Sequence, residues 1–200
     1  MVGHPERQSS DLSASAAILS KSSPTSAGHL HYPRHFQLLI GLSIFLAILA
    51  RAHPSGDLNG SFALFGTLHA SALVITLRVR PSIWPSCLFV AIAAGLSVMT
   101  LRIGMLGTHL FGALPGHVGL YAVLGFSAAA GALAYGMLIR RLPGLSAIRL
   151  SSLAAISLGC MLAAWVALLT GSHFHLPGPS WLAILWWHAF SGGLWYFDRP

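Results

Sequence analysis

The sequence predicts an all-α polytopic membrane protein, a bundle of about six transmembrane helices that follows a disordered N-terminal tail. Apolar residues make up 55% of the 200 residues and charged residues only 8%, whereas a soluble domain carries about 25% charged residues. The mean hydropathy is +0.73. Because so few charges cannot cover a water-facing surface, the composition excludes soluble enzymes and nucleic-acid-binding folds, and it makes the lipid bilayer the first partner.

Residues 1–34 differ in kind from the rest of the chain. They are rich in Ser, Ala, Pro and His and contain no sustained apolar run, which predicts a mobile cytoplasmic tail before a helical domain at 35–200. Four histidines lie in or beside this tail: His4, His29, His31 and His35. We interpret them as tail histidines close to a membrane surface, although His29, His31 and His35 also have a spacing that allows weak metal binding.

Six apolar runs predict membrane spans near 36–52, 62–77, 83–101, 118–139, 150–171 and 180–197. A helix needs about 20 residues to cross the hydrocarbon core, with about 17 as the lower end. The stretch 103–116 is uncharged but is broken by Gly104, Gly107, Gly112 and Pro115. It is too short to span alone, so we expect a re-entrant or interfacial segment there.

The basic residues predict the orientation. If the N-terminus is inside, nine basic residues are cytoplasmic and only Arg51 and Arg102 are outside. Such a bias is the rule for membrane proteins, so we expect both termini in the cytoplasm, most simply of a bacterial inner membrane. The nine are Arg7, Lys21, Arg34, Arg78, Arg80, Arg140, Arg141, Arg149 and Arg199.

One alternative removes the first span. The run Phe36–Leu49 is followed by Ala50-Arg51-Ala52 and then His53, which is typical of a signal peptide with a small-x-small cleavage site. Cleavage there leaves five spans and keeps every later loop on the same side.

The acidic residues limit the chemistry. The chain has only Glu6, Asp11, Asp57 and Asp198, and none lies within a predicted span. Ion-coupled transporters, di-iron bundles and zinc hydrolases usually need carboxylates at their sites. All three classes are therefore disfavoured.

Histidines are the remaining candidates for a metal site, because imidazole binds transition metals without a carboxylate partner. Five of them map to the outer side and can converge on one transition metal ion: His53, His109, His117, His173 and His175. His173 and His175 are separated by one residue, which places both rings on one side of an extended segment.

Two further histidines, His69 and His188, lie near the middles of the second and sixth spans. A polar ring at mid-bilayer depth must be hydrogen-bonded or coordinated. The pair can serve as axial ligands of a haem. Alternatively, each ring bonds to a backbone carbonyl or to the hydroxyl of Thr67, Ser71 or Ser191.

The fourth span contains Gly125-Phe126-Ser127, which resembles the Gly-x-Ser motif of rhomboid-like intramembrane serine proteases. That resemblance, carried by two short segments, implies Ser127 as nucleophile, His188 as its base and His69 at the oxyanion. The sequence departs from the family at Ala128, where a Gly is expected, and at Leu73, where an Asn is expected. An alternative explanation is that Ser127, Gly131, Ala132 and Gly136 form small-x-x-x-small pairs for close helix packing.

These observations favour a small, non-catalytic membrane protein that binds a metal ion or haem through histidines or assists a larger membrane complex. A rhomboid-like hydrolase using Ser127 and His188 is the first alternative, and a purely structural subunit is the second. Either a membrane-protein partner or a homo-oligomer fits the structural role.

Overall fold

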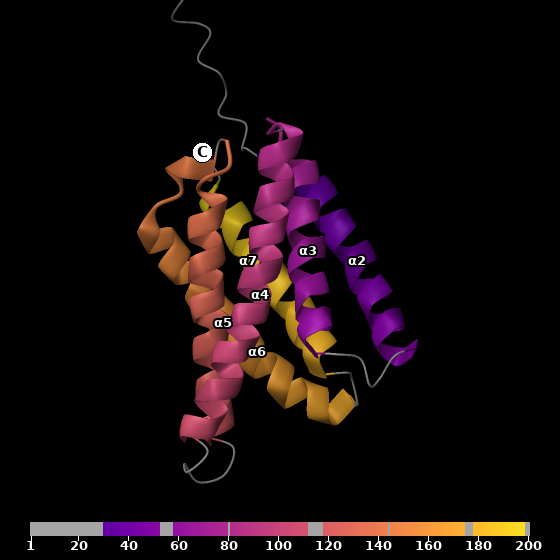
Figure 1. Ribbon diagram of the computed structural model, residues 1–200, viewed down its shortest axis with the longest axis vertical. Helices are drawn as coiled ribbons and strands as arrows, with labels where there is room; N and C mark the ends of the chain where they lie inside the picture. Colours follow the sequence, from indigo (N-terminus) through magenta and orange to yellow (C-terminus); the bar gives the residue numbers. More distant parts are fainter. Residues whose placement is uncertain are drawn as a thin grey trace, which may run out of the picture.

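The computed structural model describes residues 30–52, 58–79, 81–111, 118–143, 145–174 and 178–198. In these ranges, six long α-helices run up and down in one bundle (Figure 1). No β-strand occurs in these ranges, and the only extended pairing there is an isolated bridge between Leu30 and Leu77. The all-α class predicted from the sequence is confirmed.

The helices follow the predicted apolar runs closely. Their bounds are α2 Tyr32–Ala52, α3 Leu58–Thr76, α4 Ile83–Phe111, α5 Val118–Ile139, α6 Leu150–Phe174 and α7 Gly178–Phe197. A short 3₁₀ turn, Leu145–Ala147, precedes α6. Helix α2 begins at Tyr32, before the Phe36 start that the apolar run suggested, and Leu30 and Tyr32 are already buried against the bundle.

We expected a re-entrant segment at 103–116, and this is wrong as far as Phe111. Helix α4 continues without a break to Phe111 and has 29 residues. Its glycines pack rather than break the helix. A methyl group at Gly104 would lie 3.2 Å from the Ser127 hydroxyl, and one at Gly107 would lie 2.9 Å from Val123, both on α5. These glycines therefore allow α5 to approach α4 closely.

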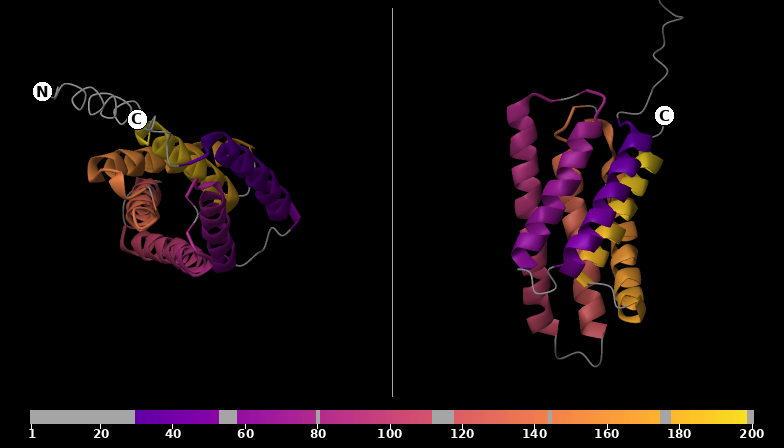
Figure 2. Two further views of the ribbon diagram at one scale, coloured as in Figure 1. Left: turned by 90° about the horizontal axis from the view of Figure 1, so that it is seen from above. Right: turned by 90° about the vertical axis from the view of Figure 1, so that its right-hand side faces the viewer.

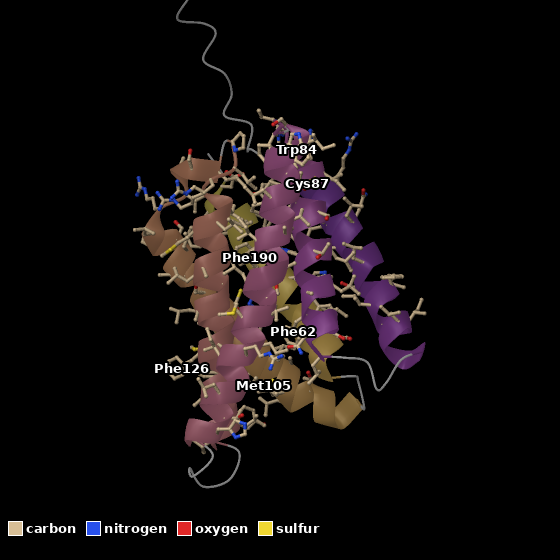
Figure 3. All side chains as sticks on the ribbon, in the orientation of Figure 1. Phe62, Trp84, Cys87, Met105, Phe126 and Phe190 are labelled. Atoms are coloured by element: carbon tan, nitrogen blue, oxygen red, sulfur yellow. The ribbon has the colours of Figure 1, made fainter. Side chains whose placement is uncertain are left out.

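The helices form a closed ring in which each packs on its neighbours in the sequence and α2 closes against α7. Figure 2 shows this arrangement from above. In addition, α3 contacts α7 across the ring. We call the end where α4 begins the Trp84 end and the end where α3 begins the Phe62 end; Figure 3 labels both residues.

Glycines on α5 also allow this helix to pack closely against α6. Side chains at Gly125 and Gly136 would collide with Trp165 and Leu153 of α6, and one at Gly131 would lie 2.9 Å from Thr100 of α4. The prediction that small residues in this span serve close packing is thus confirmed.

The exterior of the bundle is apolar, unlike that of a soluble protein. Large apolar side chains such as Ile48, Leu106 and Phe126 are more than half exposed, and Figure 3 shows Phe126 projecting away from the bundle. Fully buried positions include His35, His69 and Ser191. Such an apolar exterior is what a lipid environment requires.

Five helices, α2 to α6, are long and apolar enough to cross a membrane. The sixth, α7, has 20 residues, but its tryptophans and His188 lower its hydropathy. The structure is therefore compatible with an integral membrane protein, and the sixth span stays a prediction.

Candidate functional site

A partly open cavity of about 180 Å³ lies between α3, α4, α5 and α7. It occupies the half of the bundle toward the Phe62 end, where Phe62 and Met105 are found (Figure 3). Its wall is mainly apolar and aromatic. The lining residues are Phe62, Phe65, Gly66, His69, Leu96, Ser97, Thr100, Leu101, Gly104, Met105, Thr108, Leu124, Ser127, Ala128, Gly131, Tyr135, Leu182, Ala183, Trp186 and Trp187.

Most hydroxyl groups of the lining are bonded within their own helix. Ser97, Thr100 and Thr108 each donate to a backbone carbonyl three or four residues earlier in α4, at 2.6–3.0 Å. These hydroxyl donors are satisfied without any bound molecule, so this wall of the cavity behaves as a largely apolar surface. Ser127 makes no such bond to any described residue, so its hydroxyl is available to a bound molecule.

At the inner end of the cavity, a chain of polar side chains crosses the bundle toward the Trp84 end. Tyr135 Oη lies 3.0 Å from His69 Nδ1, and His69 Nε2 lies 3.2 Å from Ser191 Oγ. Ser191 Oγ lies 2.9 Å from His35 Nε2, and His35 Nδ1 lies 3.0 Å from Thr76 Oγ1. The chain thus joins α5, α3, α7 and α2, and all five groups are buried.

The proton positions follow from the far end of the chain. Thr76 donates its hydroxyl proton to the carbonyls of Ala72 and Leu73, at 2.7 and 3.0 Å, so it accepts from His35 Nδ1–H. A neutral imidazole has one donor and one acceptor, and therefore His35 Nε2 accepts from the Ser191 hydroxyl.

The same logic continues toward the cavity. Because Ser191 uses its proton on His35, it accepts from His69 Nε2–H, and His69 Nδ1 accepts from the Tyr135 hydroxyl. With both imidazoles neutral, every donor has an acceptor and all bonds run in one direction.

Aromatic rings enclose His69. Its ring stacks on Trp187 at 5.8 Å with an interplanar angle of 21°, and it meets the edges of Trp186 and Phe190, both at 5.9 Å. These rings exclude water and hold the imidazole in one orientation.

The chain of hydrogen bonds is better suited to recognition than to proton passage. It ends at Thr76, a buried side chain whose proton is held by its own helix. Within the described residues the only acid is Asp198, and it accepts a 2.8 Å hydrogen bond from Tyr32 instead. Without a titratable acid along the chain, the arrangement presents a fixed hydrogen-bonding group to the cavity.

Two sequence-predicted residues, His69 and His188, take the hydrogen-bonded alternative. His69 bonds to Ser191, one of the hydroxyls considered from the sequence, and His188 Nδ1 lies 2.8 Å from the Ile184 carbonyl of its own helix. Both nitrogens of His69 are occupied, so axial ligation of haem would require one of these bonds to break. The haem hypothesis stays a prediction.

Ser127, His188 and His69 are not joined as a catalytic group in the described residues. Ser127 and His69 line the cavity, whereas His188 does not. His188 bonds to Ile184, and no hydrogen bond connects it to Ser127. An activated serine needs its base within hydrogen-bond reach, so this geometry gives no support to the rhomboid-like alternative.

The proposed outer metal site falls mostly outside the described residues. His53, His117 and His175 lie there, and His173 lies in α6 with no described side-chain surroundings. His109 is exposed on α4. The residues that the structure describes contain no cluster of three His, Cys, Asp or Glu side chains, and the metal hypothesis remains a prediction.

Sequence reasoning missed His35 and Tyr135. From the sequence, His35 is interpreted as a histidine in or beside the tail, although its spacing of four from Leu39 and eleven from Leu46 puts all three on one helix face. All three are fully buried. Tyr135 had no sequence signal beyond its place in an apolar span.

Comparisons with protein-family models, with curated proteins and with solved structures found no match to this chain. We therefore infer the function from the geometry of the site.

Proposed function

We propose that the chain is an integral membrane protein that binds a small, largely apolar molecule in the cavity between α3, α4, α5 and α7, without catalysing its conversion. The observation that carries this proposal is the cavity itself, with one wall, on α4, whose hydroxyls are bonded within that helix. A close-packed interior has few voids of this size.

The volume sets the size of the guest. An apolar cavity of about 150 Å³ is enough to hold benzene, so about 180 Å³ fits a singly substituted ring or an aliphatic group of similar bulk. Trp186, Trp187 and Phe65 offer aromatic surfaces for such a guest. An apolar molecule concentrates in the bilayer, from which a partly open cavity can take it up.

Binding is tested with ethylbenzene, an apolar probe of about the right size, on protein in detergent micelles. Gly104→Leu places a side chain in the cavity, where the nearest atoms belong to Ser127. Gly95→Leu is the matched control on the same helix, with nothing within 4 Å of the added Cβ. We expect Gly104→Leu to weaken binding about tenfold or more and Gly95→Leu to leave it unchanged.

Saturation-transfer NMR against empty micelles provides the measurement. If wild type and Gly104→Leu bind the probe equally, the cavity is not its site and the proposal fails. Thr108→Trp, which adds a comparable volume at another lining residue near the end of α4, serves as a second occluding variant if Gly104→Leu is not monodisperse.

We further propose six spans with both termini in the cytoplasm. In a variant with Cys87 and Cys160 replaced by alanine, a cysteine at exposed Ser146 should react with an impermeant maleimide only after the cells are permeabilised. A cysteine at exposed His109 should react in intact cells. The opposite labelling pattern would mean that the protein has the reverse orientation in the membrane.

Retention of α2 is part of the same proposal, because this helix supplies His35 and buries Leu39 and Leu46. The intact mass of the purified protein tests it. A mass that lacks residues 1–52 would favour the cleaved signal peptide.

A further inference from the structure

We infer that the molecule bound in the cavity carries a hydroxyl or N–H group and that Tyr135 recognises it by accepting its hydrogen bond. This inference rests on the proposed binding function and adds the chemical class of the ligand. The basis is the direction of the hydrogen-bonded chain from Thr76 to Tyr135.

The chain leaves Tyr135 with only an acceptor to offer. Its hydroxyl proton is used on His69 Nδ1 at 3.0 Å, and the phenolic oxygen keeps lone-pair capacity. Tyr135 and His69 both line the cavity. A ligand that donates a hydrogen bond completes the set without disturbing any existing bond.

A ligand with only an acceptor finds no donor at Tyr135, and its hydrogen bond must come from another lining group such as the Ser127 hydroxyl. To bond to such a ligand, Tyr135 must turn its proton toward the cavity, and the four hydrogen bonds back to Thr76 must all reverse. Thr76 would then lose its bonds to Ala72 and Leu73. In the reversed state without a ligand, the Tyr135 proton would face a largely apolar wall, which is costly.

Ser191 has a positioning role in this scheme. Its oxygen lies between His69 Nε2 and His35 Nε2, at 3.2 and 2.9 Å. It therefore transmits the tautomer set at Thr76 to His69. Without the Ser191 hydroxyl, His69 is free to take either tautomer, and Tyr135 can either accept or donate.

Three probes of nearly equal shape test the inference on the full-length protein in micelles. Benzyl alcohol donates and accepts, benzaldehyde only accepts, and ethylbenzene does neither. Each affinity is referred to the partition of the same probe into empty micelles. We expect wild type to favour benzyl alcohol over benzaldehyde by about 5- to 10-fold, the effect of one net hydrogen bond.

Variants distinguish the role of Tyr135, which contacts the ligand, from that of Ser191, which fixes the hydrogen-bond direction at Tyr135. Tyr135→Phe should lower benzyl alcohol affinity about 5- to 10-fold and leave ethylbenzene unchanged. Tyr121→Phe removes a hydroxyl from the same helix at a residue that does not line the cavity. It should change neither the benzyl alcohol affinity nor the ethylbenzene affinity. Ser191→Ala should bring the ratio of benzyl alcohol to benzaldehyde to within about twofold while ethylbenzene still binds.

The outcomes are distinct. If none of the probes binds, the proposed function fails together with the inference. If all three bind wild type equally, or if benzaldehyde binds best, binding stands and the role of Tyr135 is overturned. If a Tyr135 or Ser191 variant does not fold, the ratio of benzyl alcohol to benzaldehyde in Ser127→Ala, which lacks the other available hydroxyl of the lining, decides this point.

Discussion

The polar side chains of the hydrogen-bonded chain from Thr76 to Tyr135 and those of the cavity wall on α4 are bonded in opposite ways. In the chain, His35, His69 and Ser191 are bonded to side chains of other helices. On α4, Ser97 and Thr100 are bonded within their own helix. The cavity lies beside the second set of residues.

This difference shows how one apolar bundle can hold an open space and a fixed interior together. Bonds between helices tie α2, α3, α5 and α7 to one spacing, because each partner left unbonded would be costly in a low-dielectric interior. Bonds within a helix satisfy the hydroxyls without drawing neighbouring helices together. The space beside them stays available at no polar cost.

The largest effect is expected where the cavity half depends on close contact between α3 and α4. A side chain at Gly66 would overlap Ser97 and lie 2.7 Å from the backbone carbonyl of Ala93. A carbonyl within a helix cannot move aside, so Gly66→Leu should cost about 3 kcal/mol or more.

Size-exclusion chromatography and thermal unfolding in detergent check this expectation. Gly41→Leu is the matched control, because nothing lies within 4 Å of a Cβ at Gly41. If Gly66→Leu remained as monodisperse and stable as Gly41→Leu, the close contact of α3 with α4 would be contradicted.

A smaller effect is expected from breaking the chain at its centre. Ser191→Ala removes the partner of two buried imidazole nitrogens, at 2.9 and 3.2 Å, and each unsatisfied group costs about 1–3 kcal/mol. Ser157→Ala removes a buried hydroxyl that donates only to Leu153 of its own helix. We expect Ser191→Ala to lower the melting temperature clearly more than Ser157→Ala does; equal shifts would mean that the hydroxyl does not hold the helices together.

The sequence predicted the helices well and the site only in part. An apolar run predicts a helix because lipid offers no hydrogen bonds to the backbone, which must therefore satisfy its own polar groups. The predicted bounds 118–139 agree with those of α5. The pairing of His69 with Tyr135 could not be predicted, since the two lie 66 positions apart and meet only through the order of helices in the ring. His35 was missed because it stands just before the first strongly apolar run.

The cavity had no sequence signal at all. Its walls use the same glycines, alanines and serines that elsewhere allow helices to touch, as at Gly136 against Leu153. Whether a small residue closes a contact or leaves a space depends on the size of the side chain opposite. That side chain is known only once the neighbouring helix and its rotation are known.

The smallest effect is expected where the ring of helices closes. Tyr32 at the start of α2 donates a 2.8 Å hydrogen bond to Asp198 just after α7, and Leu30 pairs beside it with Leu77. Tyr32→Phe keeps the ring and removes this one bond, for which we expect a loss of about 1 kcal/mol and a fall in melting temperature of about 2–4 °C. Tyr196→Phe, at an exposed tyrosine near the same end, is the control and should have no effect. If the two variants unfold at the same temperature, the closure depends on buried apolar contacts of α2, such as Leu39, rather than on the polar groups at its first turn. The hydrogen bonds that hold α2 to the other helices would then be those of the interior chain from Thr76 to Tyr135.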